Sequence, residues 1–143
     1  MKLAVIRIRG RRKISPNIEK TLGLLRLERP NHCILLDDSA QNIGMLNIVK
    51  DYVTFGPVEE VTIFKLLCKR GKKGRKLLRA VMKEEEIKQV ATEISSGKKA
   101  IEFVNPVFRL RPPSKGYKDT KSHYPKGDLG KRQEMDSLLR RMI

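Results

Sequence analysis

The side chains best suited to chemistry in this chain are lysines and arginines, which gather in three stretches. Residues 9–13 and 69–76 are almost continuously basic, and residues 109–132 add further cations with tyrosines and a histidine among them. Lysine and arginine neutralise phosphates, whereas tyrosine and histidine stack on unpaired bases. The pattern predicts RNA contacts by these cationic or stacking side chains: Arg9, Arg11, Arg12, Lys13, Lys69, Arg70, Lys72, Lys73, Arg75, Arg109, Arg111, Lys115, Tyr117, Lys118, Lys121, His123, Tyr124, Lys126, Lys131 and Arg132.

The overall charge also indicates a polyanionic partner. The chain has 32 Lys and Arg against 16 Asp and Glu, a formal net charge of +16. For any one basic run a solvated surface is an equally good explanation, but three runs and this surplus together favour nucleic acid. An anionic membrane is the second alternative. It would favour a helix with one basic and one bulky apolar face, whereas the densest basic runs here contain Gly or Pro.

Metal binding is not predicted. His32 and Cys33 are adjacent on an expected strand, so their side chains point to opposite faces, and Cys68 and His123 are isolated in the sequence. Cys33 is better interpreted as a small core residue. The two cysteines form no disulfide framework, and the apolar start of the chain is short and contains Arg7. We therefore expect no signal peptide, no membrane span and a cytoplasmic protein.

Catalysis has no better support. The sequence contains no G-x-S-x-G, H-E-x-x-H or phosphate-binding glycine motif. Asp37 and Asp38 are adjacent carboxylates, but their position ahead of an expected helix is explained by capping. We expect a protein that is not an enzyme and that has no cofactor.

The stretch from Gly71 to Gly74 matches the G-x-x-G loop of KH domains and lies between two expected helices. Two glycines three residues apart also occur by chance in a basic linker. The motif keeps open a second function, that of a free-standing RNA-binding regulator of the KH type. An RRM is disfavoured because the first expected strand, residues 2–9, carries no aromatic side chain.

The positions of apolar residues predict the elements of the first half. Residues 2–9, 32–37 and 52–57 have strand patterns. A helix from the cap Ser15 to about Leu27 joins the first two strands, and a second capped helix joins the last two. This order predicts an α+β fold, a small sheet with helices packed on one face, in a ferredoxin-like strand–helix–strand–helix–strand core.

Two expectations concern which side chains face that core. In the first strand the alternating set Ala4, Ile6 and Ile8 is predicted to form the core face. The second helix is predicted to be capped by Asp37, Asp38 or Ser39. Its expected apolar stripe consists of Met45, Ile48, Val49 and Tyr52.

The second half of the sequence predicts a helical segment followed by an extended one, both added to the compact core. Residues 61–69 and the segment that starts at Glu84–Glu86 have helical patterns, the latter with a stripe of Ile87, Val90, Ala91 and Ile94. Residues 106–110 can form a strand. The C-terminal helix has a stripe of Met135, Leu138, Leu139 and Met142. The predicted domains are a compact core (1–57), a helical extension with a basic linker (58–104), and a strand, basic RNA-facing loop and C-terminal helix (105–143).

Residues 112–132 have Leu129 as their one aliphatic residue, so they can bury little apolar surface. An expected strand and an expected amphipathic helix flank them. The segment is therefore predicted to be a tethered loop that is mobile in the free protein and becomes ordered against RNA.

Three blocks of the sequence resemble a known family. "RIRGRRKISPNIEKTLGLLRL", "RPNHCILLDDSAQNIGMLNIVKDYVTFG", and "PVFRLRPPSKG" followed by "GDLGKRQEMDSLLRRM" occur in the family's order. They are similar to large-ribosomal-subunit protein thirty in its archaeal form, whose eukaryotic counterpart is protein seven. The resemblance covers nearly all of residues 2–57 and 105–142.

The resemblance implies a structural ribosomal protein without enzymatic activity. It further implies binding to large-subunit rRNA near the 5S rRNA, with ribosomal proteins as neighbours. Residues 2–57 would be the compact part shared with a shorter bacterial form.

The chain departs from the family at two motifs. It has Asn42-Ile43-Gly44 where members often have Tyr-Arg-Gly, so that family arginine is absent. The familiar Arg-Leu-His-Pro-Pro-Arg-Gly-Gly becomes residues 109–116, in which Ser114 replaces the second Arg. Arg111 and Lys115 replace a His and a Gly and restore the local charge.

Overall fold

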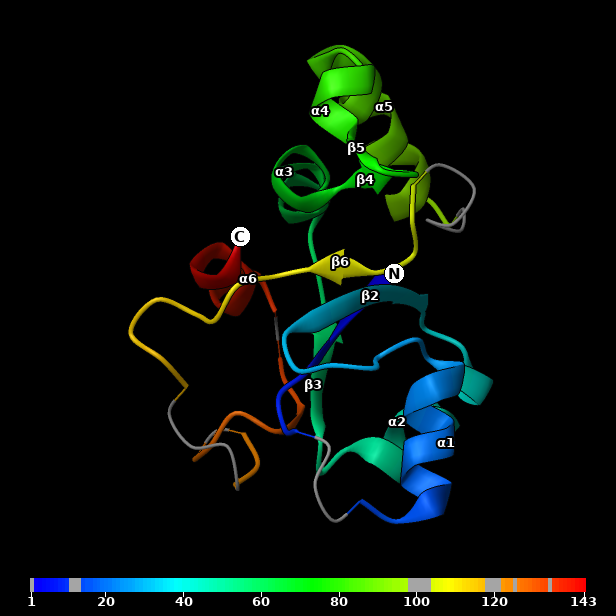
Figure 1. The fold of residues 1–143 in the computed structure, drawn as a ribbon, viewed down its shortest axis with the longest axis vertical. Coiled ribbons are helices and arrows are strands. Elements are labelled where there is room, and N and C mark those ends of the chain that lie inside the picture. Colours follow the sequence, from blue (N-terminus) through cyan, green and yellow to red (C-terminus); the bar gives the residue numbers. More distant parts are fainter. Residues whose placement is uncertain (1, 11–13, 98–103, 118–121, 125, 134) are drawn as a thin grey trace.

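The centre of the molecule is a five-stranded mixed sheet. This computed structural model describes residues 2–10, 14–97, 104–117, 122–124, 126–133 and 135–143. The strand order is β6-β2-β1-β3-β7, and neighbours are antiparallel except for β3 and β7, which are parallel (Figure 1). The strands are β1 (Lys2–Arg7), β2 (His32–Asp37), β3 (Val53–Pro57), β6 (Phe108–Arg109) and β7 (Gly130–Lys131).

Two helices, α1 (Pro16–Leu24) and α2 (Ala40–Val49), cover one face of this sheet (Figure 1). Leu22 of α1 and Leu46 of α2 pack in one buried cluster with Leu3 and Val5 of β1. The order β1-α1-β2-α2-β3 confirms the predicted ferredoxin-like core with its own helices on one face.

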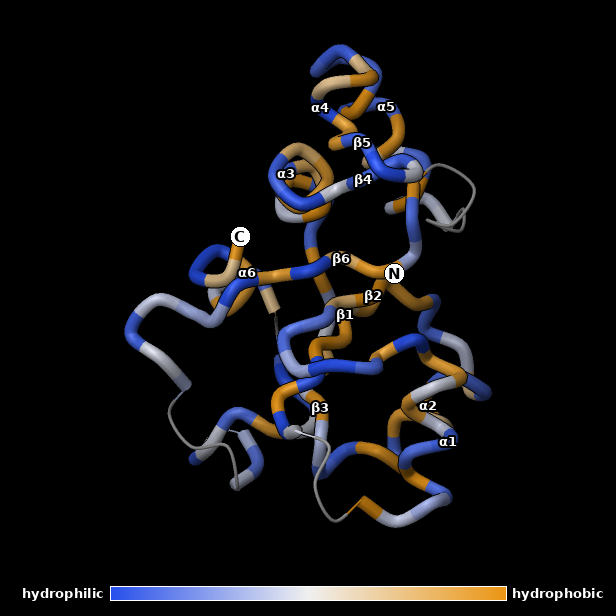
Figure 2. Tube along the Cα trace, viewed as in Figure 1, coloured by the Kyte–Doolittle hydropathy of each residue, from blue (hydrophilic) through white to orange (hydrophobic). Residues whose placement is uncertain are grey.

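The opposite face is covered by the second half of the chain. Ala4 and Ile6 of β1 join a second buried cluster with side chains of α3 (Glu60–Arg70), α5 (Glu84–Ser95) and α6 (Asp136–Met142). Figure 2 shows apolar and polar stretches alternating along these helices. The expectation of one core face for the first strand was therefore incomplete, because β1 lies at the centre of the sheet and all its residues are buried.

The start of α1 is as predicted, but its end is earlier. Ser15 caps the helix by accepting a hydrogen bond from the Ile18 N–H at 3.4 Å, with Pro16 in the first turn. The helix ends at Leu24, not at about Leu27. Arg26 adopts a left-handed φ of 63°, which closes the helix.

In α2 the stripe prediction was partly wrong. Ser39 is the capping residue and accepts from the Asn42 N–H at 3.2 Å. Leu46 and Val49 are the buried residues of the helix, whereas Ile48 is 47% exposed. Packing against α1 and the sheet selected a stripe rotated from the expected one.

The extension combines confirmed and unforeseen elements. The predicted stripes of α5 and α6 are buried in full. The expected strand at 106–110 is reduced to β6. The helix α4 (Leu78–Val81), the strand β7 and the hairpin of β4 (Lys72–Lys73) with β5 (Lys76–Leu77) were not predicted. In the described part of the chain, no helix has the length and apolar character to cross a membrane.

Candidate nucleic-acid interface

A basic groove lies where the β4–β5 hairpin approaches the segment that leads into β6. Its volume is about 540 Å³. Two basic stretches more than thirty residues apart in the sequence meet there. The described residues that line it include no carboxylate and five cations: Lys69, Arg70, Lys72, Arg75 and Arg109.

The hairpin emerges directly from the end of α3. Gly71 caps that helix, and its N–H donates to the Leu67 carbonyl at 3.0 Å. A side chain at position 71 would collide with this turn, because an added Cβ would lie 2.5 Å from the Leu67 oxygen. On the other side, the Leu78 N–H donates to the Gly71 carbonyl at 2.9 Å and closes the hairpin base.

Asn105 holds the hairpin against the chain that enters β6. Its side-chain amide donates to the Gly74 carbonyl at 2.8 Å, and its side-chain oxygen accepts from the Gly74 N–H at 3.2 Å. Its backbone N–H donates to the Lys72 carbonyl at 2.9 Å. Gly74, with φ of +68°, provides the left-handed turn that this arrangement requires. Sequence reasoning missed Asn105, although an Asn-Pro pair is a turn signal.

The register of the hairpin divides its cations between two faces. Lys72 pairs with Leu77, and Lys73 pairs with Lys76. Because side chains of successive strand residues point to opposite faces, Lys72 lies in the groove and Lys73 does not. Both lysines are exposed.

This geometry is inconsistent with the KH interpretation of the G-x-x-G motif. Lys72–Lys73 form β4 of a hairpin, so the two glycines do not bound a loop that connects two helices. The motif had suggested such a loop because a two-residue strand leaves no periodicity in the sequence.

Arg109 contributes to a positive field around β2. It pairs with His32 across the β2–β6 ladder. Burial, followed by the charges of Arg109 and Arg29, lowers the pKa of the His32 imidazole below its ordinary value. The positive charge around the β2–β6 pair therefore comes from Arg109 and Arg29 and not from the His32 imidazole. Cys33, on the opposite face, is fully buried, and burial raises the pKa of its thiol to about 12, as expected for a core residue.

The segment after Arg109 divides into exposed cations and side chains held by the fold. Arg111, Lys115, Lys126 and Lys131 are exposed. Tyr117 is half-buried against the α6 side of the core.

Tyr117 and Arg132 both have partners within the protein. The Tyr117 hydroxyl donates to the Asn31 side-chain oxygen at 2.7 Å. Arg132 is buried, and its Nε donates to the Thr54 hydroxyl at 2.8 Å. These contacts argue against RNA contacts by Tyr117 and Arg132.

Three further predicted residues have protein partners but keep exposed surface. Arg9 lies over the Tyr52 ring at 5.2 Å from its centroid. His123 Nε2 lies 2.8 Å from the Asp51 carboxylate, with both side chains about half exposed. Tyr124 is half-buried, and the Arg132 guanidinium lies over its ring at 5.3 Å from the centroid. Five predicted contact residues lie outside the described residues: Arg11, Arg12, Lys13, Lys118 and Lys121.

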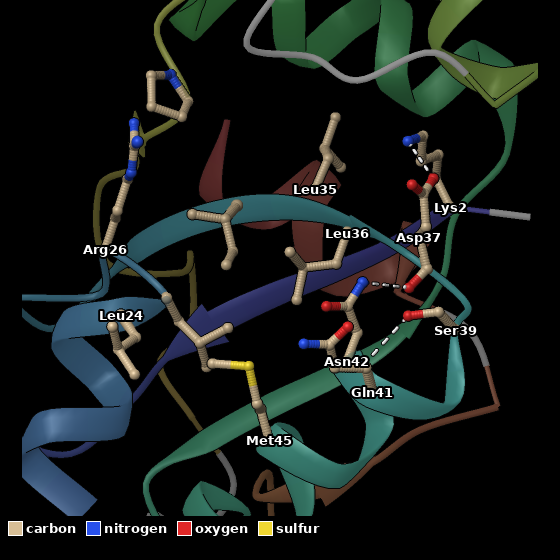
Figure 3. Close-up of a pocket in the computed structure, with 13 residues that line it drawn as sticks. Lys2, Leu24, Arg26, Leu35, Leu36, Asp37, Ser39, Gln41, Asn42 and Met45 are labelled. Atoms are coloured by element: carbon tan, nitrogen blue, oxygen red, sulfur yellow. Dashed lines mark hydrogen bonds and ion pairs between the residues drawn. The ribbon is translucent and has the colours of Figure 1, made fainter.

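A second hollow, of about 470 Å³, lies between the end of α1 and the start of α2. Figure 3 shows Arg26 on one side, the Lys2–Asp37 pair on the other, and Leu36 and Met45 between them. The Lys2 and Asp37 charges pair with each other. The rest of the lining mixes apolar and polar side chains, so charges of one sign do not gather there. In the described residues, no three His, Cys, Asp or Glu side chains are grouped as metal ligands.

The chain is similar in sequence to archaeal ribosomal proteins. The family model described as "Ribosomal protein L30p/L7e" matches residues 3–53. The large ribosomal subunit protein uL30 of Archaeoglobus fulgidus is 40% identical over 149 residues, covering 97% of this chain and 98% of that protein. The uL30 protein of Thermoplasma volcanium is 44% identical over 156 residues (99% and 92%), and that of Nanoarchaeum equitans 38% over 151 residues (98% and 97%). The chain therefore belongs to the archaeal type of the uL30 (L30p/L7e) family, whose members are structural, non-enzymatic components of the ribosome.

Proposed function

We propose that this chain is a structural constituent of the large ribosomal subunit that binds large-subunit rRNA through the basic groove, in the cytoplasm. The observation that carries the proposal is the convergence of five cations from α3, the hairpin and β6 on one groove. Such a surface neutralises several neighbouring phosphates at once, which is the main source of affinity for nucleic acid. Binding near the 5S rRNA rests on the family resemblance alone.

The proposed interface extends from the groove onto exposed cations of the C-terminal part. Arg111, Lys115, Lys126 and Lys131 are available for phosphates. Tyr117 and Arg132 are left out because the fold engages them. The three-part division of the chain at residues 57 and 104 remains a proposal, with the first part as the compact core.

The hairpin offers a matched pair of variants to test the groove. Lys72→Gln/Arg75→Gln removes two cations that line it, whereas Lys73→Gln/Lys76→Gln removes two from the same hairpin that do not. Affinity for a large-subunit rRNA transcript is measured over a range of salt concentrations. The groove variant should lower the log–log salt slope by roughly 1.4–1.8, or 0.7–0.9 for each lost phosphate contact.

The control variant should lower the slope by clearly less. Equal losses in the two variants would show that net charge matters and the groove does not. Sedimentation of the unaltered chain with intact large subunits in high salt tests the wider proposal. Release into the soluble pool would favour a free-standing RNA-binding protein instead.

A further inference from the structure

The first turns of α3 and α5 form a surface whose character is opposite to that of the basic groove. A hollow of about 590 Å³ lies there, with Val61 and Phe64 as its apolar residues. Val61 is 56% exposed, which is unusual for a large apolar side chain of this fold. The rest of the lining consists of three glutamates and one lysine: Glu60, Glu84, Glu85 and Lys88. The formal charge of the lining is therefore −2, on a chain of +16. We call these six residues the acidic groove.

The acidic groove disfavours RNA. A phosphate placed there would meet three carboxylates and one ammonium group, and like charges at short range repel. The two grooves lie toward opposite ends of α3, because Glu60 begins that helix and Lys69 and Arg70 end it. At 1.5 Å per residue the nine steps from Glu60 to Lys69 span about 14 Å. RNA bound at the basic groove therefore need not cover the acidic one.

The acidic groove is held in shape by the fold. Phe64 packs against the core cluster that contains the buried stripe of α5. The Thr92 hydroxyl donates to the Glu60 carboxylate at 2.5 Å and ties α3 to α5. Glu84 and Glu85 are exposed in the first turn of α5, where the helix dipole favours a carboxylate. An exposed valine among three carboxylates suits a ligand with both apolar and cationic side chains.

We propose that the acidic groove binds a basic, extended segment of a neighbouring protein in the ribosomal particle, an inference that rests on the proposed function. An apolar side chain of that segment covers Val61 and Phe64, and its Lys or Arg side chains face Glu84 and Glu85. Charge complementarity selects this occupant, since the lining is acidic where most of the chain is basic. One end of α3 thus contributes to RNA binding, and the other end contributes to protein binding.

A photo-crosslinking amino acid at Val61 tests the proposal in assembled large subunits. The position is exposed, so the replacement leaves the core intact. Subunits are purified by sedimentation from cells in which the variant replaces the native chain, and occupancy is measured before irradiation. The expected result is an adduct that protease removes and ribonuclease does not, with a basic protein as the partner.

Two charge reversals in the same helix turn provide the matched control. Glu85→Lys alters the acidic groove, whereas Glu86→Lys makes the same change beside it, on a residue that does not line it. Glu85→Lys should lower the yield of the Val61 adduct about threefold to tenfold, and Glu86→Lys should leave it nearly unchanged.

Each other outcome has a distinct meaning. An RNA adduct at Val61, no adduct in fully occupied subunits, or equal losses from the two reversals would overturn the acidic groove as a protein-binding site. A chain that is absent from the subunits would instead refute the proposed ribosomal function, and the inference with it.

Discussion

Arg132 and Asp128 form an ion pair that is almost wholly buried, with side chains 7% and 2% exposed. The Arg132 Nη2 group donates to the Asp128 carboxylate, and the guanidinium lies over the Tyr124 ring at 5.3 Å from its centroid. Thr54 of β3 accepts from Arg132 and donates to the Gly130 carbonyl at 3.1 Å. These contacts attach the last part of the polar segment to the edge of the sheet.

Arg132→Gln is expected to lower the free energy of unfolding by about 3–5 kcal/mol, because it breaks the buried ion pair with Asp128 and the hydrogen bond to Thr54. Lys131→Gln changes the neighbouring, exposed side chain and should alter stability by less than about 0.5 kcal/mol. Urea unfolding followed by circular dichroism measures both. Similar effects of the two variants would contradict a structural role for Arg132.

Asn105→Ala removes both side-chain hydrogen bonds to Gly74. Because the bonds are exposed, we expect a local loss of about 1 kcal/mol and little change in global stability. Amide exchange at Gly74 should become faster.

Affinity of the Asn105 variant for rRNA should fall while the salt slope stays the same, since every cation remains but the hairpin is less ordered. Asn47→Ala, on exposed α2 surface, is the control. If the Asn105 variant binds rRNA with unchanged affinity, the basic groove does not depend on the Asn105–Gly74 hydrogen bonds.

Tyr117 should produce an alkaline loss of stability. Burial, and then the Asp128 charge, raises the pKa of Tyr117 from 10.0 to about 12. The folded pKa lies above the unfolded one, so the stabilisation is complete below pH 10 and is lost as the pH rises through about 12.

Between these pH values, the wild-type chain should lose stability relative to Tyr117→Phe. Unfolding curves of both chains across that range test this, and the difference in their phenolate absorbance titrations reports the pKa of Tyr117 directly. A constant stability difference through the range would rule out the proposed coupling.

Arg26→Gly should stabilise the protein by about 0.5–1 kcal/mol, because glycine adopts a left-handed φ without the Cβ penalty. Arg26 has φ of 63°, and the bonds from its N–H to the Gly23 carbonyl (3.0 Å) and from the Leu27 N–H to the Leu22 carbonyl (2.9 Å) do not use its side chain. Lys20→Gly, inside the same helix, should destabilise by about 1 kcal/mol. The two urea midpoints should therefore move in opposite directions, and a lower midpoint for Arg26→Gly would contradict the strain at this position.

Elements with strong local signals could be predicted from the amino-acid sequence. Ser15 followed by Pro16 located the start of α1, since a capping hydroxyl and a fixed φ act within one turn. The stripes of α5 and α6 identified their buried faces because helical periodicity repeats over several turns. The net charge and the three family-like blocks indicated a ribosomal protein, which the archaeal relatives bear out.

Which cations are exposed and available to RNA depends on the packing of the whole chain. Arg132 and Lys131 are adjacent and both basic, yet one is buried and the other exposed. The difference depends on Thr54, 78 residues away in the sequence. Likewise Lys72 and Arg109 lie together in the basic groove because Asn105 holds the hairpin against the chain that enters β6. The strands that carry these two cations are each two residues long. Strands this short carry no periodicity, and long-range partners leave no local pattern, so the burial of a charge and the convergence of distant cations are properties of the packed chain alone.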